Sequence, residues 1–218
     1  MVQRIPLPNG STFQIAATMN GSKVITSVTN ANPAVVTSTA HGLTAGDIIM
    51  IDSGWGKLNG RAARVSTVTT DSFALENIDT SNLVFYPAGG GAGSFVKIAT
   101  RVEIQKITGV SMSGGEQQFL TVGYLAEDDD RQFPTNRNPM SMQLTVEDQP
   151  TAAYVKVVEG YSDNKLATVG VLTLPNGDLI LYAGFVSITE TPTLERNQLM
   201  TRTVTFSMSG RSTRYVAA

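Results

Sequence analysis

Apolar and polar residues alternate along much of this chain, so that every second position is apolar in many short segments. Alternation with a period of two predicts half-buried β-strands, and the frequent Val and Thr residues favour strands as well. One strand is predicted from Thr12 to Met19, and another from Leu199 to Ser209. The second of these places the following residues on one side: Met200, Arg202, Val204, Phe206 and Met208.

A tight hairpin and a helix are predicted in the C-terminal half. Asn176-Gly177 lies between the apolar segments 168–174 and 179–185, and both residues of this dipeptide tolerate the positive φ of a hairpin turn. Helical spacing of apolar residues is found from Ala152 to Tyr161, with Asp148 as the expected cap. The expected apolar face of this helix consists of Tyr154, Val157, Val158 and Tyr161.

Between residues 23 and 97 the predicted strands become short and are separated by turn signals, such as Asn59-Gly60. Strands at this close spacing are typical of a small barrel or sandwich. We therefore predict a small β-barrel domain at residues 23–97, inserted into a β-sandwich domain made of residues 1–22 and 98–218. The expected strands of the insert are Val24–Thr29, Ala34–Ser38, Asp47–Ile51, Arg61–Val68 and Ser72–Leu75. The glycine-rich segment 89–93 is expected to be a flexible connector or a loop tip.

A long polar segment separates two predicted strands of the sandwich domain, at residues 117–124 and 140–146. Connections in compact domains are usually about 4–6 residues long, and long ones are commonly functional or disordered. An arm this polar cannot build its own core, so we expect a neighbouring copy of the chain to order it. The acidic run consists of Glu127, Asp128, Asp129 and Asp130. The arm that follows consists of Arg131, Gln132, Phe133, Pro134, Thr135, Asn136, Arg137 and Asn138.

Composition and charge exclude several classes of protein. The 218 residues include 16 Lys and Arg against 18 Asp and Glu, so the chain lacks the basic surplus of a free nucleic-acid-binding protein. The absence of cysteine excludes disulfides, thiolate metal sites and cysteine nucleophiles. No apolar segment approaches the roughly 20 residues of a membrane span, and residues 1–10 lack the apolar core of a secretory signal. The cytoplasm in which the chain is made is therefore the expected compartment.

Few residues suggest chemistry. His41, the only histidine, precedes a glycine turn and is expected to bond to local backbone rather than to catalyse or bind a metal. Trp55, the only tryptophan, is expected to cover a small core, although stacking on a sugar or base stays open. The glycines at 89–93 are not followed by the Lys-Ser/Thr pair of a phosphate-binding loop. Arg211 and Arg214 are too few for a nucleic-acid patch. No enzyme, cofactor or metal site is predicted.

The acidic run 127–130 has three open interpretations. It is a solvated loop, or one member of a charged ring in an oligomer, or a calcium site. The last is disfavoured because the run lacks the alternating oxygen ligands and the closing glutamate of an EF-hand.

Taken together, these elements resemble the tail tube (major tail) proteins of long-tailed bacteriophages. The resemblance covers residues 1–20 and 99–218: the strand end at Val122–Glu127, the arm to Asn138, the helix after Asp148 and the Asn176-Gly177 hairpin. It is a pattern of elements rather than a short motif. It implies a mainly β, tail-tube-type sandwich or barrel with one flanking helix.

The insert resembles a small β-barrel module that recurs in phage structural proteins and is similar to a β half-domain of ubiquitin-activating enzymes. Residues 34–47, Leu58-Asn59-Gly60-Arg61 and Ser72-Phe73-Ala74-Leu75 carry this resemblance, which implies no activity. Tail tube proteins more often carry an extra domain at the C-terminus, so the early insertion departs from the family pattern. We expect the insert on the tube exterior.

The resemblance implies a virion protein that forms six-membered rings, and rings that stack into a tube through which DNA passes at ejection. Expected partners are further copies of the chain and other tail proteins, such as the tape measure, tail tip and terminator proteins. The acids at 127–130 would line the lumen and let DNA slide without specific binding. The alternatives are a receptor- or carbohydrate-binding module of a tail tip or baseplate, and a head–tail joining protein.

Overall fold

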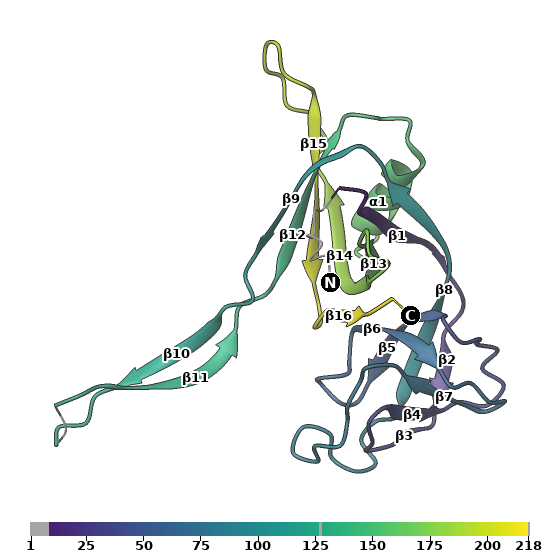
Figure 1. Cartoon of the computed structure of the whole chain (residues 1–218), viewed down its shortest axis with the longest axis vertical. Helices are drawn as coiled ribbons and strands as arrows, with labels where there is room; N and C mark the ends of the chain where they lie inside the picture. Colours follow the sequence, from purple (N-terminus) through teal and green to yellow (C-terminus); the bar gives the residue numbers. More distant parts are fainter. Residues whose placement is uncertain (1–8, 127, 218) are drawn as a thin grey trace, which may run out of the picture.

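The structure is a computed structural model that describes residues 9–126 and 128–217. Its strands form a 14-stranded curled sheet and a separate two-stranded hairpin, accompanied by one helix (Figure 1). Seven strands of the large sheet form what we call the tube sheet, in the order β8-β1-β13-β14-β15-β12-β9. Their bounds are β1 Thr12–Met19, β8 Gly93–Ile104, β9 Ile107–Ser113, β12 Ser141–Glu147, β13 Thr168–Thr173, β14 Leu179–Ile188 and β15 Thr201–Met208. The predicted mainly β fold with one flanking helix is confirmed.

The helix α1, Ala153–Asp163, packs on one face of the tube sheet. Tyr154, Val155 and Val158 are buried there together with inward residues of the strands, including Phe13 and Phe206. Every second side chain of a strand points to the same face. The alternating apolar residues of β15 therefore all point into this core. The helix was predicted within two residues, but the predicted cap was wrong. The N-cap is Ala152, and no side-chain hydrogen bond caps the helix.

Residues 23–97 build a second group of strands with a separate hydrophobic core. The strands are β2 Lys23–Ile25, β3 Ser27–Val28, β4 Ala34–Thr37, β5 Ile48–Ser53, β6 Arg61–Ser66, β7 Ser72–Leu75 and the first half of β8. Each strand expected here is present, although the segment 24–29 is divided into β2 and β3. We call this group of strands the barrel module after the expected fold, and its assignment as an inserted β-barrel domain stays a prediction.

The glycine-rich segment 89–93 is packed against the module, so its prediction as a flexible connector was wrong. A Cβ on Gly91 would lie 2.9 Å from the Val28 side chain and 3.0 Å from the Trp55 ring. The Trp55 Nε1–H donates a hydrogen bond to the Pro87 carbonyl, at 2.8 Å. The glycines are needed because backbone approaches an indole ring here, and not because the segment must move.

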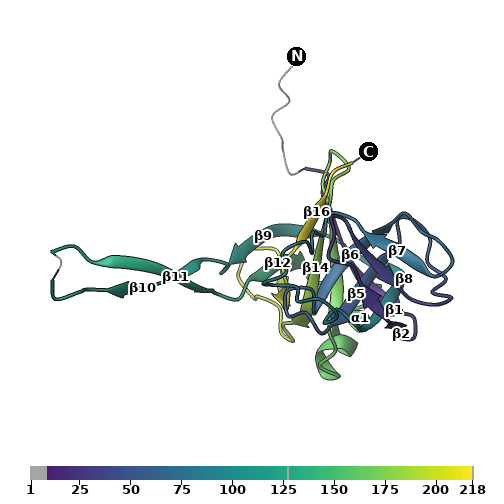
Figure 2. The ribbon, with the colours of Figure 1, turned by 90° about the horizontal axis from the view of Figure 1, so that it is seen from below.

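A third apolar cluster joins the barrel module to the tube sheet. Ile48 and Ala62 of the module contact the face opposite the helix, where Val169, Leu181 and Tyr215 lie. The tube sheet is therefore covered on one face by α1 and on the other by the module (Figures 1 and 2).

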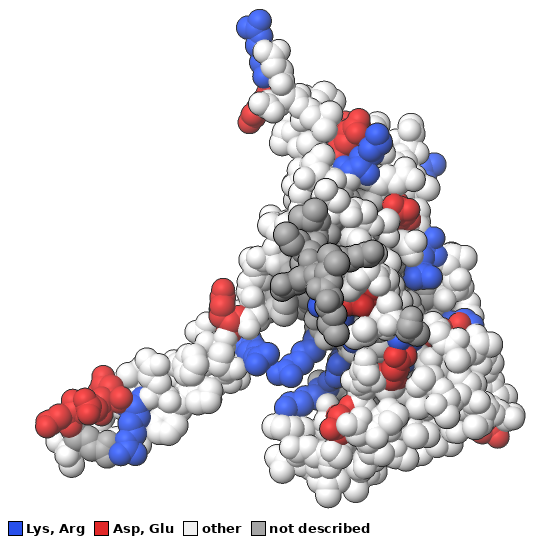
Figure 3. All heavy atoms as spheres, viewed as in Figure 1, with Lys and Arg blue, Asp and Glu red and all other residues white. Residues whose placement is uncertain are grey.

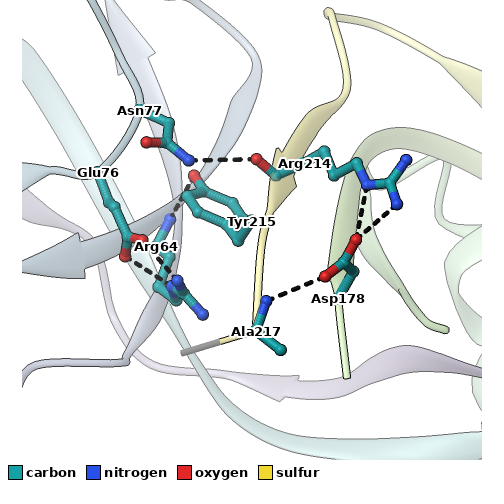
Figure 4. A network of polar contacts seen from close by, with 7 residues as sticks. All are labelled: Arg64, Glu76, Asn77, Asp178, Arg214, Tyr215 and Ala217. Carbon is teal, nitrogen blue, oxygen red and sulfur yellow. Dashed lines mark hydrogen bonds and ion pairs between the residues drawn. The ribbon is translucent and has the colours of Figure 1, made fainter. Parts of the chain in front are cut away.

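The C-terminal segment forms a short strand, β16 Thr213–Tyr215, that the sequence analysis missed. It pairs with β14 and lies between the tube sheet and the module (Figure 4). On the module side, the Arg64 backbone N–H donates to Tyr215 Oη at 2.9 Å, and Asn77 Nδ2 donates to the Arg214 carbonyl at 3.2 Å. On the other side, Asp178 accepts from Arg214 Nε at 3.0 Å. We call these contacts the C-terminal clasp.

The Tyr215 side chain is the apolar centre of the clasp, since it is fully buried. Replacing Tyr215 with Ala should lower the free energy of unfolding by about 3–5 kcal/mol, as for other large aromatic truncations. Tyr215→Phe should cost about 1–3 kcal/mol, because it leaves the partly buried Arg64 N–H without its acceptor. Urea titration measures both values. Tyr161→Phe, on the half-buried face of α1, is the control and should stay within about 0.5 kcal/mol.

The clasp should also depend on pH through Asp178. Hydrogen bonds from the Ala217 backbone N–H and from Arg214 hold the pKa of the Asp178 carboxyl below its ordinary value of 3.8. A carboxyl with a lowered folded-state pKa stabilises the fold above its ordinary pKa, and this contribution disappears as pH falls through the lowered value. Wild type should therefore melt at a higher temperature than Asp178→Asn at pH 7, and the difference should shrink below pH 3.8. A difference that does not change with pH would contradict this role.

Candidate assembly surfaces

The predicted arm is one strand of a protruding hairpin. β10, Gln117–Val122, pairs antiparallel with β11, Arg131–Arg137, and the hairpin extends away from the body (Figures 1 and 2). Residues 131–137 thus form a strand within one chain, and the expectation that a neighbouring copy orders the arm stays a prediction. Both strands of a two-stranded hairpin are edge strands. Pro134 is compatible with β11 because an edge strand tolerates a residue that has no backbone N–H to donate.

The hairpin nevertheless lacks a core. Every residue of β11 is exposed, and the apolar side chains of Phe119, Leu120 and Phe133 are about half exposed. An isolated two-stranded hairpin is at best marginally stable in water, and grouped exposed apolar residues indicate a contact surface. The hairpin thus has the properties of an element that is completed by a partner.

The acidic residues lie at the tip of this hairpin, beyond the Val122–Arg131 pair (Figure 3). Asp128, Asp129 and Asp130 are exposed, while Glu127 lies outside the described residues. Arg131 lies beside them, with its guanidinium 5.8 Å from the Tyr124 ring centre. Within residues 9–126 and 128–217, no group of three acidic or histidine side chains is arranged to hold a metal ion. We call Leu125 and Asp128–Asp130 the acidic tip.

The tube sheet has two open edges. Among the described residues β9 is its last strand and pairs with β12 only, and Val110 and Met112 on β9 are half exposed. At the other end, residues 98–104 of β8 pair with β1, while the module strand β5 pairs with β8 only up to Lys97. Open edges present unpaired N–H and C=O groups that favour pairing with another chain.

A cavity of about 300 Å³ lies where the base of the hairpin faces the barrel module. Three cations line it from three separate elements: Lys57 from the β5–β6 loop, Arg137 from the end of β11 and Arg211 from the β15–β16 loop. Basic side chains gather in the same region of Figure 3. We call this the basic notch. The sequence analysis missed it because these residues are far apart in the chain.

Neutral or aromatic groups contact two of the notch cations. Lys57 Nζ lies 2.8 Å from the Phe85 ring centre, and Arg137 Nε donates to Gln117 Oε1 at 3.2 Å. Burial lowers the pKa of the nearby Arg61 guanidinium, and the positive charge of Arg211 lowers it further.

The two residues that could have carried chemistry have structural contacts. His41 Nδ1 accepts a hydrogen bond from the Leu43 backbone N–H at 3.0 Å, which confirms the predicted local bond. Trp55 is 2% exposed and packs edge-on against Tyr86 in the module core, as predicted for a residue that covers a small core. Stacking of Trp55 on a sugar is therefore wrong, because its ring faces are buried.

Hydrogen exchange should distinguish the hairpin from the body in the isolated subunit. Since β10 and β11 are held by each other alone, their amides should exchange at least about tenfold faster than those of β12 and β15. Equal protection in the hairpin and in the tube sheet would show that the hairpin is stable without a partner.

A family model and a solved structure are similar to this chain. The family model described as "Phage tail tube protein, TTP" matches residues 53–217, which is well over half of the chain. A solved structure of the anti-feeding prophage cap, described as a tube terminating cap, is similar at 18% identity and a TM-score of 0.34. The match covers 55% of this chain and 84% of that chain. No curated protein matches.

None of the described helices is long and apolar enough to cross a bilayer. The family is a structural one, so its members are components of the virion tail and not enzymes. On the strength of the match over residues 53–217, this chain belongs to the phage tail tube protein family.

Proposed function

We propose that six copies of this chain close into a ring, and that rings stack into the tail tube through which DNA passes at ejection. Family membership supports the tube, and the open edges of the tube sheet support the ring. The observation that carries the proposal is that this sheet ends in β9 and in residues 98–104 of β8, and neither has a second strand partner among the described residues.

Side-by-side contact would pair both edges at once. If β9 of one copy lies against residues 98–104 of β8 in the next, each edge gains a backbone ladder. The two surfaces differ, so the contact is heterologous, and a heterologous contact with the right rotation closes into a ring. Closure removes the exposed edges that would otherwise promote irregular aggregation.

The arm would then bridge copies. Residues Arg131 to Asn138 and the facing strand β10 extend beyond the body, and their exposed apolar side chains would be buried against another subunit. In this proposal the segment 23–97 is an inserted module on the outside of the tube. Lumen lining by Asp128–Asp130 stays a prediction from the sequence, as do contacts with tape measure, tail tip and terminator proteins. The carbohydrate-binding alternative loses its motivation, because Trp55 is buried.

Electron microscopy of the purified chain tests the proposal. Wild type should form striated tubes, either spontaneously or on an initiating tail-tip complex. A variant with residues 118–136 replaced by an Asn-Gly turn should keep its melting temperature, since the hairpin contributes nothing to the three cores. It should nevertheless fail to form tubes. Wild-type protein that stays monomeric under both conditions would contradict the proposed function, and tubes from the shortened variant would contradict the role of the arm.

A further inference from the structure

The acidic tip and the basic notch carry opposite charge on the same chain. We propose that the acidic tip of one copy docks into the basic notch of another copy of this chain. This inference rests on the proposed function, in which the arm bridges copies. It adds the receiving surface and the residues on both sides.

The notch of the same copy is out of reach of the tip. Arg137 pairs with Gln117 at the base of the hairpin, whereas the acids follow the Val122–Arg131 pair at its far end. Six strand residues at about 3.3 Å each separate the two ends by on the order of 20 Å. Arg137 is also part of the hairpin itself, so bending the hairpin at its base does not bring its tip to that residue. The occupant of the notch must come from a second molecule.

The charge pattern of the notch suits a group of carboxylates. Its lining contains Lys57, Arg137 and Arg211 and no Asp or Glu. The closest acid in sequence, Glu116, accepts a hydrogen bond from Asn138 and is not a lining residue. None of the ion pairs described for residues 9–126 and 128–217 involves these three cations. The acidic tip contains three carboxylates, and Arg131 is the described cation beside them, so the negative charges outnumber the positive one.

Apolar contacts add to the match. Leu83, Val84 and Phe85 form an exposed apolar loop of the module, and the Lys57 ammonium lies over the Phe85 ring. At the other surface, Leu125 projects fully into solvent directly before the acids. A docked tip would bury this leucine near an apolar loop while its carboxylates meet the cations. Contacts of both kinds give a protein–protein interface its usual combination of apolar core and charged rim.

DNA phosphate is the other polyanion that three cations could attract. Few cations and a net charge of −2 disfavour it, because binding by phosphate neutralisation needs an extended basic face. The second copy is favoured, since its acids are fixed at the end of a projecting element of the right shape.

A charge exchange tests the pairing. The tip-reversed variant is Asp128→Lys with Asp129→Lys, and the notch-reversed variant is Lys57→Glu with Arg211→Glu. Each should raise the critical concentration for tube formation at least about tenfold, because like charges then face each other. The chain that carries all four changes should recover wild-type assembly within about threefold. Sedimentation of tubes against protein concentration gives these values.

Matched controls change the same charges elsewhere. Asp163→Lys with Glu190→Lys, and Lys156→Glu with Lys165→Glu, alter exposed residues of α1 and of the loops after α1 and β14, none of which line the notch, and should assemble as wild type does. Melting temperatures of all variants show that each is folded. If the reversed variants assemble normally, or if the combined variant fails to recover, the pairing is wrong. Normal tubes from the tip-reversed variant with slowed genome ejection would assign the acids to the lumen instead.

Disulfide trapping gives an independent readout, because the chain contains no cysteine. Asp129→Cys with Arg211→Cys in one chain should give a ladder of covalent oligomers after oxidation of assembled tubes, since disulfides need Cα atoms within about 7 Å. Asp129→Cys with Lys156→Cys should stay monomeric on a denaturing gel. Monomers from both pairs in intact tubes would overturn the docking proposal and leave the proposed function in place. Failure of wild type to assemble at all would remove both. Loss of binding to duplex DNA in the notch-reversed variant, with assembly unchanged, would assign the notch to DNA.

Discussion

The structure depends on backbone hydrogen bonding along one strand, β8. Its first half pairs with β2 and β5 of the barrel module, and its second half pairs with β1 of the tube sheet. Because buried backbone groups must be hydrogen-bonded, this continuous strand fixes the direction in which the module leaves the sheet. The C-terminal clasp adds a second attachment through β16 and Tyr215. Two attachments and a shared apolar cluster make the module a rigid part of the subunit rather than a tethered one.

The hairpin is held in the opposite way. None of the described elements adds a third strand or a helix to it, and it carries both apolar side chains and charges into solvent. Pro134 and the acids of the tip protect such an edge from indiscriminate pairing, since charge and proline both disfavour the addition of another strand. The same features leave room for one complementary surface. Pro134 and the acids of the tip thus have two roles. They disfavour aggregation of the free subunit, and they would select the partner of the hairpin in an assembly.

Sequence patterns predicted the elements that rest on local signals. β1 and β7 have the predicted bounds, Thr12–Met19 and Ser72–Leu75, because alternation and flanking turns define them. β16 was missed because three residues are too short for a pattern, and Tyr215 is buried by strands distant in sequence. Asp148 resembled a cap, but the chain makes a further turn before the helix begins at Ala153.

The candidate surfaces were predictable to different extents. The arm and its acids were visible as an unusually polar connection, whereas its strand pairing depends on β10 matching it residue by residue. The basic notch gave no sequence signal, because Lys57, Arg137 and Arg211 come together only when the module, hairpin and tube sheet are assembled. A net charge of −2 also hides the separation of acids and bases onto different surfaces.

Two kinds of contact are needed for a tube, and the subunit has two kinds of surface. In the proposed assembly, edge pairing of the tube sheet is a heterologous contact that becomes saturated once a ring closes, so it would not by itself lengthen the assembly. Contact between an acidic tip and a basic notch is also heterologous, but each added copy brings a new free tip. If the tip reaches the next ring, the contact repeats without end along the axis. If the acidic tip and the basic notch lay on one surface, two copies would satisfy each other in a closed dimer. In the proposed assembly, the hairpin separates the two surfaces by its length and so would permit a filament.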